Sequence, residues 1–244
     1  DERVKNAQAQ RRGRGPLSSP HTIDGLYGKS LNLTASRVDT FYSCRFAFFM
    51  QYGLKAKPRR VAKFDALSTG TFIHYVLEHA LDALGKCEGG AAHADQPTVR
   101  KACREAVRQY VAEELGGLEN KTARFQYLFR RLVRAVEQIL DNVIEELRVS
   151  DFAPIDYELD FSRSGDLPPV QCEDGDVSVS LSGKVDRVDG YIKNGRLYLR
   201  VMDYKSGKKS FSLSDIWYGL NMQLIIYLYA LQQEGLGRYR ARLT

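Results

Sequence analysis

Hydrophobic positions recur with helical spacing between residues 34 and 148. Aromatic and aliphatic residues follow Thr34, a favourable helix cap, and predict a helix that ends at Gly53. A second apolar stripe predicts a helix that begins near Ser68, and two more amphipathic helices are expected at about 97–115 and 124–148. This part of the chain is therefore predicted to be mainly helical.

After Pro154 the pattern changes to short runs in which apolar and polar residues alternate. These runs predict strands at 157–161, 177–188 and 196–204, with a loop between the first two. Asn194 and Gly195 separate the last two runs and favour a tight hairpin turn, because both residues tolerate positive φ. A last helix is expected at about 214–233, before Gly235. Helices on either side of a mixed sheet predict an α/β or α+β layered domain.

Residues 1–30 show neither helical spacing nor strand alternation of apolar residues. They are rich in Gly, Pro, Ser and Arg, and are expected to form a flexible basic linker that packs little. The remainder, 31–244, is predicted to be one domain with a mainly helical part at 31–150 and a sheet with its following helix at 151–244.

Charge and hydropathy narrow the class of protein. The 244 residues carry a formal net charge of +6, with basic clusters near 11–14 and 55–63 that suit a polyanionic partner or simply a solvated basic face. No apolar run approaches the roughly 18 residues that span a bilayer, and the charged start lacks a signal peptide. We expect a soluble, cytoplasmic protein with no membrane partner, cut from a longer polypeptide.

The last predicted strand carries the candidate chemistry at its end. Asp203 and Lys205 share the face of its apolar residues, and Asp186 lies across the predicted hairpin, where it can approach Asp203. Two converging carboxylates repel each other unless a cation lies between them, and oxygen ligands favour Mg²⁺ or Mn²⁺. A lysine beside such an ion suits phosphodiester hydrolysis. A surface salt bridge is the alternative interpretation, and Asp189 competes with Asp186 as the ligand.

Four motifs in order resemble those of RecB-type nucleases in the PD-(D/E)xK superfamily. They are Gly70-Thr71-Phe72-Ile73-His74, Gly183-Lys184-Val185-Asp186-Arg187-Val188-Asp189, Asp203-Tyr204-Lys205-Ser206-Gly207 and Gln223-Leu224-Ile225-Ile226-Tyr227. Segments between residues 26 and 54 resemble the entry into the nuclease domain of AddB-type proteins, the second subunits of AddAB helicase–nucleases. The resemblance covers roughly 26–80 and 155–232. It implies a restriction-endonuclease-like fold: a mixed central sheet flanked by helices, with an additional N-terminal helical portion.

The resemblance also implies a role for each motif residue. Asp186, Asp203, His74 and the backbone carbonyl of Tyr204 would be metal ligands, and Lys205 would be the catalytic lysine.

The last motif would serve the same site. Gln223 and Tyr227, one helical turn apart, would contact the DNA backbone or brace the site. Glu78, which shares a helix face with His74, and Glu158 on the first strand are candidates for support of the ligands.

Cys44 poses a separate question. In AddB-type proteins a cysteine in this Cys-x-Phe context is the first ligand of a [4Fe–4S] cluster, although Arg45 stands where the family usually has Pro. Cys87, Cys103 and Cys172 are not spaced as the other three ligands, which in the family follow the last motif. We expect either a domain truncated at its C-terminus or a relative without the cluster, no cluster in this chain, and Cys44 as a free, partly buried thiol.

The predicted function is Mg²⁺- or Mn²⁺-dependent DNA hydrolysis, as exonuclease-type end processing in double-strand-break repair and recombination. DNA and an AddA-type helicase subunit would be the partners, since no Gly-x-x-x-x-Gly-Lys-Ser/Thr loop for ATP occurs here. One alternative is an inactive nuclease-fold module that binds DNA, which the intact motif residues oppose. The other is a stand-alone RecB-like nuclease, which the AddB-like entry segment opposes.

Overall fold

The computed structural model describes residues 17–57, 66–205 and 212–240. The first 16 residues of the predicted linker, most of the basic cluster near 55–63 and the end of the third motif, Ser206-Gly207, lie outside the described residues. Of the described helices, none is both long enough and apolar enough to cross a membrane.

A helical layer forms the first half of the domain. It consists of α5 (Ala66–Gly85), α6 (Gly90–His93), α7 (Gln96–Glu113) and α8 (Ala123–Arg148). The three longer helices confirm the predictions from apolar spacing. Their facing stripes meet in one core, in which residues such as Leu81, Val99 and Leu140 are fully buried.

The strands form two small sheets. One is antiparallel, with the order β2 (Ala153–Phe161), β5 (Gly183–Lys193), β6 (Arg196–Met202). The other is mixed: β4 (Val177–Leu181) pairs in parallel with β1 (Ser30–Leu33) and antiparallel with β3 (Val170–Asp174). The hairpin between β5 and β6 turns at Asn194 and Gly195, with φ of 52° and 70°, as predicted.

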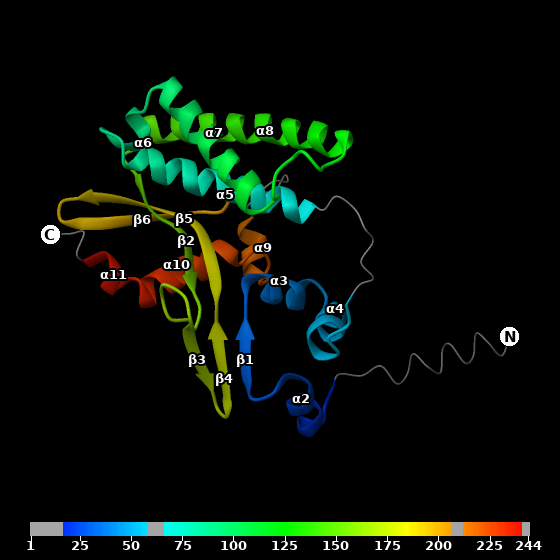
Figure 1. Ribbon diagram of the computed structural model, residues 1–244. Coiled ribbons are helices and arrows are strands. Elements are labelled where there is room, and N and C mark those ends of the chain that lie inside the picture. Colours follow the sequence, from blue (N-terminus) through cyan, green and yellow to red (C-terminus); the bar gives the residue numbers. More distant parts are fainter. Residues whose placement is uncertain (1–16, 58–65, 206–211, 241–244) are drawn as a thin grey trace.

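The antiparallel sheet lies between two helical layers (Figure 1). α5, α7 and α8 cover one side, and α10 (Gln223–Glu234) and α3 (Ala35–Ser43) lie on the other. A second core, which includes Leu159, Val185 and Ile226, joins the sheet to α10. The site residues therefore lie where the helical layer meets the antiparallel sheet.

Three strand predictions need correction. The strand expected at 177–188 divides into β4 and β5 at Ser182, because β1 holds that residue: its N–H donates to the Leu33 carbonyl at 2.9 Å and its hydroxyl to Asn32 Oδ1 at 2.7 Å. β3 occupies the region expected to be a loop. β1 was not expected at all, since four residues give too short an alternation to recognise.

Two helix predictions were also too simple. The helix expected from Thr34 to Gly53 breaks at Cys44, whose extended backbone separates α3 from α4 (Arg45–Phe48) and the π-helix η1 (Phe49–Gly53). The helix expected at 214–233 divides into α9 (Leu213–Trp217) and α10, and α11 (Leu236–Arg240) follows. Gly219 and Asn221, with φ of 77° and 55°, make the intervening turn.

Part of the predicted linker is ordered. Pro20–Tyr27 forms α2, because Ser19 caps it and Pro20 suits the first helical position. Its last residue, Tyr27, stacks on Phe48 with 5.8 Å between the ring centroids. The first described segment of the chain thus packs against η1 and α4.

Gly183, the first residue of β5, has no room for a side chain. A Cβ there would lie 2.7 Å from Phe161 Cζ and 3.0 Å from Tyr227 Cε1. We expect Gly183→Ala to lower the free energy of unfolding by about 1–3 kcal/mol, because one of the two rings must shift. Urea denaturation measures the change. Gly25→Ala, at a helical glycine with open space around it, is the matched control and should not destabilise. An unfolding midpoint for Gly183→Ala equal to that of the wild type would contradict the expectation.

Candidate active site

His74 projects from α5 toward the ends of the strands. Its Nε2 lies 3.0 Å from the Tyr204 carbonyl oxygen, and its Nδ1 lies 3.4 Å from Asp186 Oδ1 and 3.6 Å from Glu158 Oε1. A carbonyl can only accept, so Nε2 carries a proton, and the two carboxylates favour a second proton on Nδ1. Contact with Glu158 raises the pKa of His74, with Asp186 adding to the effect and burial opposing it.

Glu158 and Asp186 face each other across adjacent strands. The β2–β5 register pairs Tyr157 with Arg187 and Leu159 with Val185, so these two acids lie at the intervening position. Glu158 has a φ of 46°, a strained value for a residue with a side chain. Tyr157 packs on the helical core and Leu159 on the other core, although residues two apart in a regular strand face the same side of the sheet. The unusual backbone conformation at Glu158 therefore reverses the alternation of side chains along β2. The reversal turns the acid toward His74.

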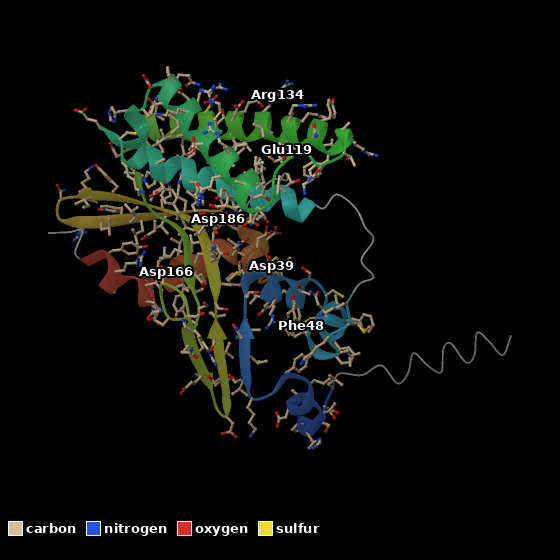
Figure 2. All side chains as sticks on the ribbon, viewed as in Figure 1. Asp39, Phe48, Glu119, Arg134, Asp166 and Asp186 are labelled. Carbon is tan, nitrogen blue, oxygen red and sulfur yellow. The ribbon has the colours of Figure 1, made fainter. Side chains whose placement is uncertain are left out.

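These three residues form a compact donor group. The ligand atoms of His74, Glu158 and Asp186 all lie within 4.8 Å of one another, the one such group among the described residues. Asp186 lies where the helical layer meets the sheet (Figure 2). Two carboxylates and an imidazole suit a divalent cation. Without a metal ion, protonation of His74 compensates part of the negative charge of the two carboxylates. The donor set therefore fits the metal that the motifs imply.

Asp186 is held firmly and is only 8% exposed. The backbone N–H of Tyr204 donates to its Oδ2 at 2.6 Å. The pKa of Asp186 is raised to about 6, chiefly by burial and in smaller part by the negative charges of Asp203 and Glu158, while the Tyr204 N–H and His74 oppose the rise. The backbone of Tyr204 thus contacts Asp186 through its nitrogen and His74 through its oxygen.

Asp203 follows β6 directly and is held by two side chains. Lys205 Nζ lies 2.7 Å from it, and Gln223 Nε2 donates to its Oδ1 at 2.9 Å. Gln223 also donates to the Tyr227 hydroxyl at 2.8 Å, so α10 braces the end of the strand. The last β5–β6 pair is Arg187 with Met202, and one further step places Asp203 opposite Asp186, as the hairpin predicted.

Asp186 and Asp189, the two acids of the second motif, make different contacts. Asp189 is fully buried and accepts from Arg187 at 2.9 Å and from Arg200 at 2.7 Å, so its oxygens are occupied away from His74. Glu146 of α8 extends this ionic network, at 2.8 Å from Arg200. Asp186, in contrast, contacts His74.

Two predicted residues lie apart from the donor group. Glu78 lies 3.9 Å from His79 and makes no contact with His74 in the described structure, although burial and the nearby charge of Glu158 raise its pKa. Cys44 is exposed rather than partly buried, because its sulfur accepts from the Ala47 N–H at the start of α4 and so remains at the surface.

Two neighbours of the site were missed in the sequence. Lys184 lies 2.8 Å from Glu158 Oε2, and its position two residues before Asp186 on β5 was an available signal of a shared face. Arg187 is fully buried and donates to the Tyr204 hydroxyl at 2.8 Å. A buried arginine has no sequence signature, because arginine is ordinarily a surface residue.

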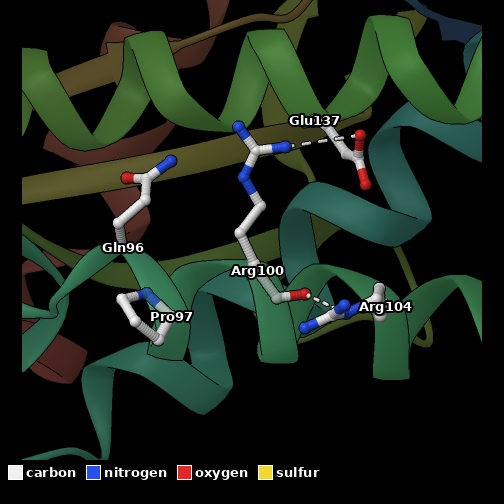
Figure 3. A pocket seen from close by; sticks show the side chains of 5 residues that line it. All are labelled: Gln96, Pro97, Arg100, Arg104 and Glu137. Carbon is white, nitrogen blue, oxygen red and sulfur yellow. Dashed lines mark hydrogen bonds and ion pairs between the residues drawn. The ribbon is translucent and has the colours of Figure 1, made fainter.

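A shallow cavity of about 450 Å³ between α7 and α8 contains none of these residues (Figure 3). Arg100 in its wall pairs with Glu137 and Asp141, at 3.5 and 3.0 Å, so this arginine is not available to recruit an anion. The candidate chemistry belongs to the strand ends, not to this cavity.

The chain matches known proteins over most of its length. A model of the PD-(D/E)XK nuclease superfamily matches residues 32–243. The second subunit (AddB) of the ATP-dependent helicase/deoxyribonuclease of Ruminiclostridium cellulolyticum is 40% identical over 214 residues, which cover 86% of this chain and 18% of the relative. The corresponding AddB proteins of Clostridium botulinum (strain Loch Maree) and Caldanaerobacter subterraneus are 38% and 36% identical, over 87% and 88% of the chain and 19% of each relative.

The chain thus spans about a fifth of the length of the curated relatives it matches. Their identity over most of the chain confirms the resemblance to AddB-type proteins that the motifs predicted. The family match covers the helical layer, both sheets except the first two residues of β1, and every predicted site residue. The chain belongs to the PD-(D/E)XK nuclease superfamily.

Proposed function

We propose that this chain hydrolyses DNA phosphodiester bonds with a bound Mg²⁺ or Mn²⁺ ion. The observation that carries the proposal is the convergence of His74, Glu158 and Asp186 within 4.8 Å, beside an Asp203–Lys205 pair at 2.7 Å. A structural salt bridge would need only one acid and one base. A histidine between two acids, with a third acid on the adjacent strand end, supports a cation site instead.

His74, Asp186 and Asp203 would hold the ion together with the Tyr204 carbonyl, and Glu158 is a further candidate ligand. When bound, the ion would polarise the phosphodiester and lower the pKa of a water molecule. His74 must then give up one of its two ring protons, because a ligating imidazole nitrogen is deprotonated.

Lys205 and α10 would act on the substrate and on Asp203. The Lys205 side chain is 38% exposed, so its ammonium can reach a phosphate oxygen and stabilise the charge that develops there. Gln223 keeps the Asp203 carboxylate oriented, and Tyr227 in turn holds Gln223. These contacts favour bracing of the site as the role of Gln223 and Tyr227.

The setting we propose follows the names of the relatives. They are called subunits of an ATP-dependent helicase/deoxyribonuclease, so this chain would process DNA ends in recombination and double-strand-break repair in the cytoplasm, alongside a helicase partner. An inactive DNA-binding module and a stand-alone nuclease are the competing outcomes of the test below.

Metal dependence of cleavage tests the proposal. We expect labelled single- and double-stranded DNA to be cut in Mg²⁺ or Mn²⁺, and cutting to stop in EDTA or in Asp203→Ala, because both remove the means to neutralise transition-state charge. Asp176→Ala, at an exposed acid in the β3–β4 turn, is the matched control and should cut normally. Because the chain spans part of its relatives, the same pair of variants is also tested with the chain in place of the matching segment of a full-length relative. Absence of metal-dependent cutting in both settings would leave the inactive module as the function.

A further inference from the structure

Three large aromatic side chains project into water beside the candidate active site. Trp217 is 85% exposed, Tyr218 70% and Tyr42 56%. We call these residues the aromatic ledge. Burial of rings of this size is strongly favourable, so a fixed cluster of exposed rings indicates a surface that receives a partner.

The turn between α9 and α10 positions the residues of the aromatic ledge. The ring of Tyr42 lies against Gly219, where a Cβ would approach it to 2.7 Å and where φ is 77°. Asn221 also has positive φ, and its amide donates to Asp215 Oδ2 at 2.9 Å. The turn between α9 and α10 therefore holds the ring of Tyr42 against the backbone that directly follows Trp217 and Tyr218.

The ledge is continuous with the site. Met222 in the same turn donates its N–H to Asp39 of α3 at 3.4 Å, and the next residue, Gln223, bonds Asp203. α3, which carries Tyr42, also packs against α10. A linear polymer bound on the aromatic ledge could thus reach Asp203 by crossing this turn.

The charges around the ledge favour a polyanion. Its acids, Asp39 and Asp215, are engaged in hydrogen bonds that build the turn. Arg45 is exposed, with its guanidinium 5.3 Å from the centroid of the Phe41 ring next to Tyr42. Exposed rings interleaved with arginine are the features that bind single-stranded nucleic acid, since every base has a face to stack and every phosphate a charge.

We propose that the aromatic ledge stacks the bases of single-stranded DNA and leads the strand to Asp203. This inference rests on the proposed function for its substrate and adds the surface that selects unpaired bases. Bases in a duplex interior are already stacked and cannot occupy the rings, so the ledge would favour single strands over blunt duplexes.

Trp217 is the one tryptophan of the chain and reports on the ledge directly. In EDTA, oligo(dT) should quench its fluorescence as it binds, and an abasic oligonucleotide of equal length should bind more weakly and quench little. Oligonucleotide binding without quenching would overturn the proposal. No cleavage is involved, so quenching in a chain that never cuts would retain the ledge and reject the nuclease, and cutting without quenching would do the reverse.

Variants separate stacking from charge. By fluorescence anisotropy, Trp217→Ala and Tyr218→Ala should each weaken oligo(dT) binding by about 5- to 50-fold with an unchanged salt slope. The double variant should bind oligo(dT) and the abasic strand alike, and Trp217→Phe should restore part of the affinity. Leu213→Ala, at an equally exposed apolar residue of α9, is the matched control. Oligo(dT) affinity equal to wild type in the double variant would overturn the proposal and assign the ledge to a protein partner.

Discussion

Replacement of Lys205 by Ala lowers the rate constant of DNA cleavage by about a thousandfold at saturating metal and DNA, if the proposed chemistry is right. The ammonium is the one cation that the described structure places on Asp203, at 2.7 Å, whereas the neighbouring Lys184 is paired with Glu158 at 2.8 Å. Metal binding should survive, since removal of the lysine frees Asp203 for the ion. Single-turnover cleavage measures the first effect and calorimetric titration with Mn²⁺ the second.

The contrast between the two measurements is what identifies a catalytic lysine. Lys205→Arg should not restore the rate, because a planar guanidinium does not occupy the position of a compact ammonium. Lys193→Ala, at an exposed lysine near the hairpin turn, is the control and should cut at the wild-type rate. If Lys205→Ala lost metal binding along with cleavage, the lysine would serve only to shape the site.

Asp186→Asn should make the metal-free chain more stable while abolishing metal binding at the proposed site. The pKa of Asp186 in the folded chain is about 6, above its ordinary value. An acid whose pKa is raised in the folded chain contributes stability that is fully present at a pH below its ordinary pKa. This stability is lost as the pH rises through the folded-state pKa of about 6. At pH 8 the charge therefore destabilises the fold, and its removal should add about 1–3 kcal/mol to the free energy of unfolding.

Urea denaturation in EDTA at pH 8 and pH 4 measures the first part of this prediction. The gain should appear at pH 8 and vanish at pH 4, where the acid is protonated in the wild type. Saturating Mn²⁺ should stabilise the wild type and leave Asp186→Asn unchanged, because only a folded chain that binds the ion gains from it. A variant less stable than the wild type at pH 8 would show that the carboxylate supports the fold, contrary to the raised pKa.

Much of the site followed from pattern alone. Alternation along the last strand predicted that Asp203 and Lys205 share a face, and the Asn194–Gly195 turn predicted that Asp186 lies across from them. The turn forms and β5 pairs with β6 from Lys193–Arg196 to Arg187–Met202, although β6 ends just before Asp203. Helical spacing likewise located α5, α7 and α8, since an amphipathic stripe of 18 or more residues is a strong local signal.

Other features depend on contacts between distant segments. Glu158 was only a weak candidate, because its turn toward His74 depends on a positive φ that strand alternation cannot anticipate. The breaks at Cys44 and at the turn before α10 were missed for a similar reason: the apolar period continues through them, while the backbone does not.

The sequence by itself determined the helices of the first half, the hairpin, and the order of motifs that identifies the superfamily, because periodicity, turn chemistry and motif order are local properties. Only the tertiary structure decided which acid joins His74, why Asp189 is excluded by Arg187 and Arg200, and which aromatic rings remain in water. Those outcomes depend on packing and on the pairing of buried charges between segments far apart in the chain.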